Sequence, residues 1–366
     1  MKKILFTATV DSHILNFHLP FLKYFKENKY EVHVATNGYE KIPYCKFKHV
    51  VSFARNPFKF NNIKAVFQLK KIIKNNKYEI IHTNTPMGSV VTRLAAIGSN
   101  ARLIYTAHGF HFYKGAPLIN WVIFFPVEWI LSFCTDTLIT INMEDYNLAK
   151  KYFHTCVKYV PGIGLNEEKL NFKMSKKEKN LFRSSLKLKD DDFVMIYVAE
   201  LNKNKNQGWL IKTLCNFLKN NKNVHILLPG KDSINRKYEN LVDHLELNKQ
   251  IHFLGFRKDI LKLLNISDLS ISVSKREGLP VNIMEAMSVG LPIVALDTRG
   301  VRDLIINDIN GFVINKNDKE KFIYKINSIY YQKELLTKKF KKANKSLIKN
   351  YSLEKIMNLM IEIYNI

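Results

Sequence analysis

Short apolar runs alternate with amphipathic segments along the chain. Ile4–Val10 and Tyr78–His82 are apolar runs with the length of buried strands, whereas His13–Lys26 carries apolar residues at helical spacing. Strands that alternate with helices predict parallel βαβ units, so we expect an α/β fold with doubly wound parallel sheets. The same alternation predicts further strands at Tyr30–Thr36, Arg102–Ala107, Asp136–Ile141 and Val157–Val160, and further helices at Ile63–Lys74, Pro86–Ile97 and Met143–Phe153.

The alternation is interrupted between about Pro161 and Lys189. This stretch begins with the chain-breaking sequence Pro161–Gly164 and continues as a polar, lysine-rich segment. We therefore predict a first domain over residues 1–165, a linker over 166–190 and a second domain over 191–345. The second series contains expected strands at Phe193–Ala199, Val224–Leu228, Ile251–Leu254, Leu269–Val273, Ile293–Leu296 and Phe312–Ile314, and expected helices at Trp209–Lys219, Asn235–Leu247, Lys319–Asn350 and Leu353–Tyr364.

Length and composition fit a two-domain chain. It has 366 residues, of which 46% are hydrophobic and 24% are charged, as in folded soluble proteins. Four scattered cysteines without metal-ligand spacing, and no apolar run long enough to span a bilayer, predict a reducing, cytoplasmic location. The net charge of +25 favours anionic partners. Because no nucleic-acid-binding motif accompanies the charge, we expect an anionic membrane surface as a partner, and no nucleic acid.

Two glutamates lie near a predicted helix N-terminus. The strand Leu269–Ser274 is followed by a loop that contains Glu277 and by a helix, opened by Pro280, that carries Glu285. A helix N-terminus binds phosphate groups, and carboxylates accept hydrogen bonds from sugar hydroxyls. The stretch therefore predicts a nucleotide-sugar site. For either glutamate alone, the alternative is a helix cap or a solvated carboxylate.

This stretch resembles a known signature. Ser274–Pro280 together with Glu285–Val294 is similar to the signature of family-four retaining glycosyltransferases, which have the GT-B fold. The resemblance implies two Rossmann-like domains that face a central cleft, with residues 346–366 forming a C-terminal helix that packs back on the first domain. It also implies that Glu277 is a catalytic residue that contacts the donor sugar, and that Glu285 binds the ribose. The implied nucleotide-binding residues in this stretch are Gly278, Leu279, Pro280, Val281 and Glu285.

Other loops of the second domain add candidate donor-binding residues. Lys205, in the loop after Phe193–Ala199, resembles the lysine of the family's diphosphate-binding loop, and we expect it to bind the diphosphate and to act in catalysis. Glu200 stands where the family has an arginine, and Lys203 is the residue that can substitute for it. The alternative for this loop is a solvated basic turn. The resemblance further implies donor contacts by Gly230 and, near the nucleotide base, by Phe256 and Arg257, for which turn and core packing are the alternatives.

The first domain contributes a second group of candidates. His108 resembles the histidine that this family points at the reacting sugar, whereas a lone histidine at a strand end is usually structural. Asp11, Ser12 and His13 follow the first strand, where the family has a loop near the acceptor. Asp190–Asp192 has the spacing of a metal motif of the other major glycosyltransferase fold, but it precedes a strand. We interpret it as a polar turn and expect no metal ion or other cofactor.

The segment Pro117–Phe133 is the most apolar part of the chain. Its aromatic residues suit a bilayer interface, whereas Pro126 and Glu128 argue against a membrane span. A buried helix is the alternative, and it is the one we favour from the sequence. Together with His108–Phe112, the segment resembles bacterial exopolysaccharide and capsule glycosyltransferases.

These features predict a retaining glycosyltransferase. We expect it to transfer a hexose or an N-acetylhexosamine from a nucleotide-diphosphate sugar, with UDP as the expected nucleotide, to a lipid-linked saccharide at the inner face of the cell membrane. One alternative is a nucleotide-sugar epimerase of the same fold, which needs no acceptor. The other is a basic nucleic-acid-binding protein without enzymatic activity.

Overall fold

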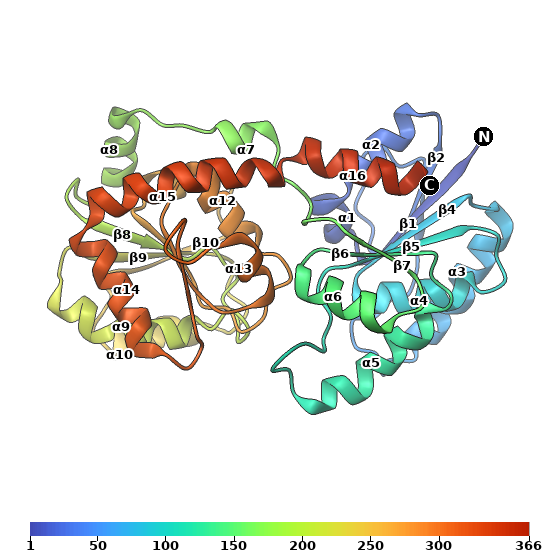
Figure 1. The fold of residues 1–366 in the computed structure, drawn as a ribbon, viewed down its shortest axis with the longest axis horizontal. Helices are drawn as coiled ribbons and strands as arrows, with labels where there is room; N and C mark the ends of the chain where they lie inside the picture. The colour runs from blue at the N-terminus through green and yellow to red at the C-terminus, as the bar shows by residue number, and fades with distance from the viewer. Residues whose placement is uncertain (366) are drawn as a thin grey trace. The chain divides into compact units, whose positions relative to one another are not determined.

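The chain forms two units, each built on its own parallel sheet (Figure 1). A computed structural model describes residues 1–365. The first unit comprises Met1–Ile163 and the C-terminal segment from Ile356 onward, and the second comprises Gly164–Lys355. Residues 166–190, for which the sequence predicted a linker, therefore belong to the second unit.

The first unit contains a sheet of seven parallel strands. Their order is β3-β2-β1-β4-β5-β6-β7, so the direction of strand addition reverses between β1 and β4. Strand β1 pairs with both β2 and β4, and its register places Phe6 opposite Val34 and His82. The strands are β1 (Lys3–Val10), β2 (Glu31–Asn37), β3 (Phe47–Val50), β4 (Ile80–Asn84), β5 (Arg102–Ala107), β6 (Thr137–Thr140) and β7 (Cys156–Tyr159).

Helices cover both faces of this sheet (Figure 1). On one face, α1, α2 and α16 pack on a core that includes Ile4 and Phe6. On the other face, α3 and α4 pack on Leu5 and Ile81. Near β5 and β6, α5 and α6 share a smaller aromatic cluster. The helices are α1 (Asp11–Phe17), α2 (Leu19–Glu27), α3 (Asn61–Asn76), α4 (Pro86–Ala96), α5 (Leu118–Ser132), α6 (Met143–Tyr152) and α16 (Leu353–Asn365).

Helix α16 completes the core of the first unit from the far end of the chain. Its apolar residues Ile356, Met360 and Ile363 have helical spacing and lie in the same core as β1. Tyr364 is buried, and its hydroxyl lies 2.7 Å from Nδ1 of His82 in β4. The Arg102 guanidinium donates hydrogen bonds to the carbonyls of Ile363 and Tyr364, at 2.6 and 3.0 Å. These bonds use carbonyls that have no partner within the helix.

The second unit contains a sheet of six parallel strands in the order β10-β9-β8-β11-β12-β13. The reversal of strand order lies between β8 and β11, where the loops after these two strands diverge. Ligands of open α/β sheets bind at such a point, at the carboxyl ends of the strands. The strands are β8 (Phe193–Ile196), β9 (Val224–Pro229), β10 (Ile251–Gly255), β11 (Leu269–Ser272), β12 (Ile293–Leu296) and β13 (Phe312–Ile314).

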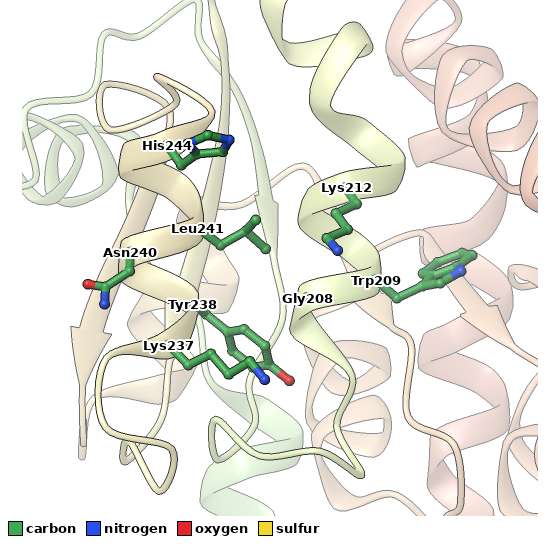
Figure 2. A pocket seen from close by; sticks show the side chains of 8 residues that line it. All are labelled: Gly208, Trp209, Lys212, Lys237, Tyr238, Asn240, Leu241 and His244. Atoms are coloured by element: carbon green, nitrogen blue, oxygen red, sulfur yellow. The ribbon is translucent and has the colours of Figure 1, made fainter.

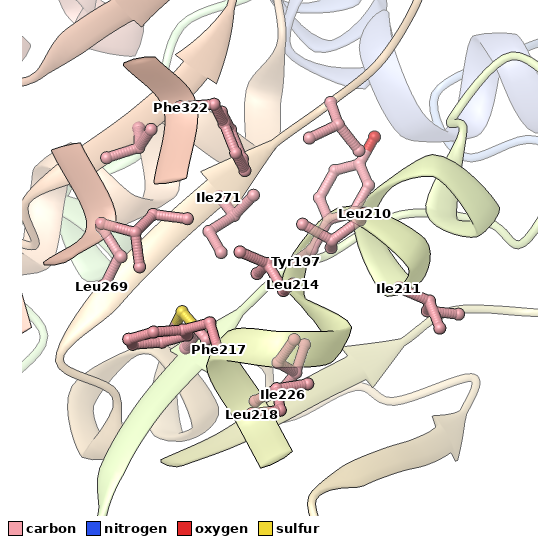
Figure 3. Close-up of a cluster of buried hydrophobic side chains, with 14 of the residues drawn as sticks. Tyr197, Leu210, Ile211, Leu214, Phe217, Leu218, Ile226, Leu269, Ile271 and Phe322 are labelled. Atoms are coloured by element: carbon pink, nitrogen blue, oxygen red, sulfur yellow. The ribbon is translucent and has the colours of Figure 1, made fainter. Parts of the chain in front are cut away.

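A large apolar core lies between this sheet and its helices. Figure 3 shows Leu210, Leu214 and Phe217 of α9 directed at Ile226 and Ile271 of the sheet. On the other face, α12 packs against α7, α11 and α15. The helices of this unit are α7 (Glu167–Asn171), α8 (Lys176–Ser185), α9 (Gln207–Asn220), α10 (Lys237–His244), α11 (Ile260–Ile266), α12 (Val281–Val289), α13 (Arg299–Leu304), α14 (Lys319–Tyr331), α15 (Lys333–Leu347) and the 3₁₀ helix η1 (Ile348–Tyr351).

The two parallel, doubly wound sheets confirm the predicted fold class, while several local predictions were wrong. The expected helix Lys319–Asn350 is interrupted at Gln332, which lies between α14 and α15. The edge strand β3 and helices α7, α8, α11 and α13 were not predicted from the sequence pattern. The preference for a buried helix over Pro117–Phe133 was also wrong, because Leu118 and Val122 of α5 are 78% and 63% exposed.

Candidate functional site

The loops after β8 and β11 bring two predicted catalytic residues together. Lys205 follows β8 and Glu277 follows β11, and these strands are neighbours in the sheet. The Lys205 Nζ lies 2.5 Å from Oε1 of Glu277, and the two side chains are 23% and 12% exposed. An ammonium and a carboxylate therefore lie side by side at the carboxyl edge, where a nucleotide-sugar diphosphate and its sugar need a cation and a hydrogen-bond acceptor.

Polar residues that the sequence analysis did not identify hold these loops in place. The Tyr197 hydroxyl donates to the carbonyl of Lys205 at 2.9 Å and lies 2.7 Å from Oγ of Ser274. Burial raises the pKa of Tyr197, so its hydroxyl keeps its proton at neutral pH. Asn204 donates to the carbonyl of Arg276 at 3.1 Å. The Tyr197–Ser274 and Asn204–Arg276 contacts join the loop after β8 to the loop after β11, whereas the bond to the Lys205 carbonyl holds the first loop on Tyr197.

Helix α12 begins directly after the Glu277 loop. Pro280 is its N-cap, and Val281 is its first residue, one position later than the sequence suggested. Leu279 and Pro280 are buried, whereas Gly278 and Val281 are partly exposed. A nine-residue helix presents free N–H groups and a positive end near Glu277. This end of the helix is the predicted diphosphate site.

Close packing of α13 fixes the loop that precedes α12. A Cβ atom on Gly300 would lie 2.1 Å from the carbonyl oxygen of Gly278 and 2.6 Å from Cα of Leu279. Only a glycine permits this approach. This role of Gly300 was not predicted, because its partners Gly278 and Leu279 lie in another loop.

Glu285 is buried in α12 and has a cationic partner of its own. The Lys169 Nζ, from α7, lies 2.6 Å from Oε1 of Glu285. Lys169 lies in the segment predicted to be a linker and was not among the predicted site residues. Both glutamates of the signature are thus paired with a lysine. Each pair joins helix α12, or the loop before it, to another segment of the second unit.

The Gly230 turn after β9 is tied closely to the loop after β8. A Cβ atom on Gly230 would lie 1.9 Å from the carbonyl oxygen of Ala199, so a side chain is excluded there. Glu200, at the position of the family's arginine, accepts a hydrogen bond from the Ser233 hydroxyl. Lys203 is exposed, two residues before Lys205. Lys203 thus extends from the same loop into solvent.

The loop after β10 carries the predicted base-contacting residues. The carbonyl of Gly255 accepts a hydrogen bond from the N–H of Gly230 at 2.8 Å, which joins this loop to its neighbour. Phe256 is 74% exposed. Arg257 makes a bidentate ion pair with Asp259, at 2.8 and 2.6 Å. The Phe256 ring is accessible to a base, whereas the Arg257 guanidinium is already paired.

The predicted acceptor residues of the first unit form the first turn of α1, and are not in a loop. Asp11 is buried and accepts hydrogen bonds from the Thr36 hydroxyl at 2.5 Å and the Lys48 ammonium at 2.8 Å. Burial acts to raise the pKa of Asp11, but these bonds outweigh it and leave the pKa below its usual value. Asp11 therefore joins α1 to β2 and β3, whereas Ser12 is exposed and His13 is partly exposed.

His108 belongs to a cluster of histidines. Its Nε2 lies 3.2 Å from Nε2 of His13 and 3.4 Å from Oδ1 of Asn84. Burial lowers the pKa of His108 to about 4 and is also the main cause of the lowered pKa values of His13 and His18. These imidazoles are therefore neutral at neutral pH. In this state each ring has one nitrogen that donates and one that accepts.

A separate cavity of about 580 Å³ lies between α9 and α10 (Figure 2). Lys212 of α9 and Leu241 of α10 face each other across it. Gly208 allows the two helices to approach, because a Cβ atom there would lie 2.8 Å from the Tyr238 ring. The predicted donor-binding residues do not line this cavity, so it is distinct from the candidate donor site.

Two helices of the first unit expose apolar side chains. In α3, Ile63 and Phe67 are 56% and 70% exposed, and Phe60 at its N-cap is also exposed. In α5, Leu118 and Val122 point to solvent. Helix α4 packs against both α3 and α5, so these two helices belong to the same group of packed helices (Figure 1). We call Phe60, Ile63, Phe67, Leu118, Ile119, Val122 and Ile130 the apolar patch.

Lysines accompany the apolar patch. On α3, the exposed Lys70, Lys71 and Lys74 continue the row that begins with Ile63 and Phe67. Apolar and basic side chains on one helix are typical of helices that lie at a membrane interface. Among residues 1–365, no helix is both long enough and apolar enough to cross a bilayer.

Comparisons with known proteins match both units to glycosyltransferases. Residues 178–347 match the family described as glycosyl transferases group 1, and residues 3–142 match the family described as glycosyl transferase 4-like. The chain is 39% identical to the putative glycosyltransferase EpsD of Bacillus subtilis (strain 168), over 100% of this chain and 96% of EpsD. It is 28% identical, over 75% of this chain and 72% of the relative, to the UDP-Gal:alpha-D-GlcNAc-diphosphoundecaprenol alpha-1,3-galactosyltransferase of Escherichia coli.

A solved structure has the same fold. HepE of Anabaena, crystallised with UDP and glucose, superposes with a TM-score of 0.81 at 20% identity, covering 100% of both chains. At this identity the likeness establishes the fold alone. It agrees with the two parallel, doubly wound sheets described above.

Proposed function

Because the chain belongs to the group 1 glycosyltransferases of the GT-B fold, we propose that it is a retaining enzyme of cell-surface polysaccharide synthesis. Its donor is a UDP-linked hexose or N-acetylhexosamine, and its acceptor is a lipid-linked saccharide. The name of the E. coli relative, which pairs a UDP-sugar with a diphospholipid-linked acceptor, supports both substrates. The observation that carries the proposal is the Lys205–Glu277 pair beside the N-terminus of α12.

The residues of this site have separate roles in the proposed transfer. The bond between the anomeric carbon and the diphosphate oxygen breaks, and UDP leaves with the electron pair. The acceptor hydroxyl bonds to the same face of the sugar, and its proton passes to the departing phosphate oxygen. Lys205 and the N-terminus of α12 stabilise the charge that develops on the diphosphate. Glu277 orients the sugar and Glu285 binds the ribose. For His108 of the first unit, we propose a separate role beside the anomeric carbon.

The site supplies its positive charge from protein groups. Lys205 contributes a full charge and α12 a partial one, and both lie at the carboxyl edge of β8 and β11. We therefore propose that transfer requires no metal ion or other cofactor.

The proposed acceptor is membrane-bound, and the first unit has a surface that suits a membrane. The apolar patch can enter the interface, while Lys70, Lys71 and Lys74 approach anionic headgroups. Each such lysine contributes about 1 kcal/mol near an anionic surface. We propose that the protein associates reversibly with the inner face of the cell membrane through this surface.

Two measurements test the proposal. UDP-, GDP- and ADP-sugars are first compared for their ability to raise the unfolding temperature, since a ligand of the folded state stabilises it. The sugar that stabilises most is then incubated with a lipid-linked saccharide, and the anomeric proton of the product is observed by NMR. An α-linked product from an α-linked donor is expected. A β-linked product would overturn retention, and no stabilisation by any of the sugars would argue against the donor site.

Two further measurements separate the proposed transferase from the epimerase and from the nucleic-acid-binding protein. An epimerase changes the UDP-sugar without an acceptor, so sugar analysis after incubation with the donor alone identifies it. A nucleic-acid-binding protein would retain RNA or DNA during purification. Acceptor-dependent transfer is the outcome that our proposal requires.

A further inference from the structure

Three histidines of the first unit meet although they are distant along the chain. His13 lies in α1, His18 lies between α1 and α2, and His108 follows β5. One ring nitrogen of each lies within 4.8 Å of the others. The parallel pairing of β1 with β4, and of β4 with β5, brings the segments after β1 and β5 to the same edge of the sheet.

The buried member of this cluster lacks a hydrogen-bond partner. His18 is 2% exposed, and within the described residues neither Nδ1 nor Nε2 makes a hydrogen bond. The amide nitrogen of Asn84, whose oxygen lies near His108, is likewise buried without a partner. By contrast, both ring nitrogens of the neighbouring His82 are bonded, to the Tyr364 and Thr106 hydroxyls. Buried polar groups are normally satisfied, so the His18 imidazole indicates a missing partner.

We propose that His13, His18 and His108 form a binding site for a divalent transition-metal ion of the zinc class, and that an ion bound there inhibits transfer. Neutral imidazole is a preferred ligand of such ions, and three histidines leave a fourth position open to water. The inhibition rests on the proposed function, because an imidazole that coordinates a metal is not available to the donor sugar.

The spacing of the nitrogens fits this chemistry. Zinc–nitrogen bonds of about 2.0–2.1 Å place two ligand nitrogens of a tetrahedral site about 3.3 Å apart. The Nε2 atoms of His13 and His108 are 3.2 Å apart, so this pair already has the required separation. The His18 nitrogen lies within 4.8 Å of both, so its ring has to move closer to complete the proposed set. No carboxylate belongs to the three-histidine set, so a hard ion such as Mg²⁺, which prefers oxygen ligands, is not expected to bind.

Metal binding is measured directly on the full chain after treatment with a chelator. Zn²⁺ is titrated in competition with a chromophoric chelator, and Co²⁺ binding is followed by its visible absorption. We expect one ion per chain, at least tenfold weaker binding in His18→Asn and in His13→Asn, and no competition by Mg²⁺. His244→Asn is the matched control, since His244 is exposed on α10. Unchanged Zn²⁺ affinity in both cluster variants, or no binding by the wild type, would overturn the proposal.

Two further measurements test whether each variant is folded and whether the bound ion inhibits transfer. Circular dichroism and the unfolding midpoint without metal establish that each variant is folded. If the buried His18→Asn variant does not fold, the partly exposed His13→Asn carries the test. Metal-stripped wild-type enzyme should transfer sugar in EDTA, lose at least tenfold in turnover with one equivalent of Zn²⁺, and recover when the chelator is added. Binding without loss of turnover would overturn the inhibition, whereas absence of transfer in EDTA would contradict the proposed function and leave the binding result intact.

Discussion

Replacing Lys205 by methionine removes the positive charge from the candidate donor site while keeping most of the side-chain stem. We expect Lys205→Met to weaken UDP binding strongly and uridine binding by less than about twofold. Uridine lacks the diphosphate, and the Lys205 ammonium is paired with the Glu277 carboxylate at 2.5 Å. The ratio of the two losses therefore reports whether Lys205 binds phosphate.

The contacts of Lys205 set the size of the effect. A hydrogen bond to a charged group contributes about 1.5–3 kcal/mol, which corresponds to about 10- to 150-fold in Kd. The variant also leaves Glu277 unpaired beside an anionic ligand. Two like charges about 6 Å apart repel by about 3 kcal/mol at an effective dielectric constant of 20, and salt reduces this value. Both contributions weaken UDP binding, so the loss should exceed tenfold.

Calorimetric titration with UDP and uridine measures both affinities. Lys222→Met is the matched control, because Lys222 is exposed and lies just before β9, at the opposite edge of the sheet from Lys205. It removes the same charge and should leave both affinities within twofold of the wild type. Adding Glu277→Gln to Lys205→Met should restore part of the lost UDP affinity, since it removes the repulsion.

Two results would refute this reasoning. An equal loss for UDP and uridine would mean that Lys205 shapes the loop and does not bind phosphate. A further loss of UDP affinity on adding Glu277→Gln would mean that the unpaired carboxylate does not repel the diphosphate. Either result would remove the ion pair from the proposed donor site.

Three further predictions concern the site, the membrane and pH. Glu277→Ala should reduce turnover at least 100-fold with UDP affinity nearly unchanged, whereas Glu285→Ala should weaken the binding of UDP. Turnover is measured by steady-state kinetics and UDP affinity by titration, and unchanged turnover in Glu277→Ala would contradict its role. The protein should sediment with anionic vesicles at low salt and be released at high salt. An Ile63→Ser/Phe67→Ser variant should sediment less, because it removes apolar side chains from the apolar patch. Equal sedimentation of the variant and the wild type would mean that the apolar patch does not contribute to membrane binding. Burial and the nearby His225 lower the pKa of His252 to about 4, so the unfolded chain, with a pKa of about 6.5, binds the proton more readily. The free energy of unfolding should thus fall by about 2 kcal/mol from pH 7 to 4.5. Urea unfolding of His252→Gln should show a smaller decrease over the same range. An identical decrease in the variant would mean that protonation of His252 does not cause the pH dependence.

The strands and the signature loop could be predicted because their information is local. Buried parallel strands such as Ile293–Leu296 are continuous apolar runs, and the Gly290 C-cap marks the end of α12, where it adopts a positive φ of 83°. Edge strand β3 was missed because Phe47–Val50 mixes apolar and basic residues and is partly exposed. Helix α8 was missed for a similar reason, since it is rich in lysine and its anchor is a buried arginine, Arg183.

The contacts that assemble the sites could not be predicted from neighbouring residues. Lys205 and Glu277 are 72 positions apart, and Lys169 and Glu285 are 116 apart. Their pairing depends on which strands are neighbours in the sheet, and strand order is a property of the whole topology. The exposure of α5 could not be predicted from the sequence for another reason. A helix with apolar residues on every side, such as α5, is normally predicted to be buried. Only the packed structure shows which of its faces contacts no other element.

The return of helix α16 to the first unit has a consequence for synthesis on the ribosome. The sheet of the first unit is complete once Tyr159 has been made, but Ile356 to Tyr364, which cover one of its faces together with α1 and α2, follow about 200 residues later. At roughly 5–20 residues per second, about 10–40 s pass before α16 completes the cover of that face. The second unit, which is continuous along the chain, can therefore close before the first. During this interval the apolar surface that α16 later covers is a natural target for a chaperone.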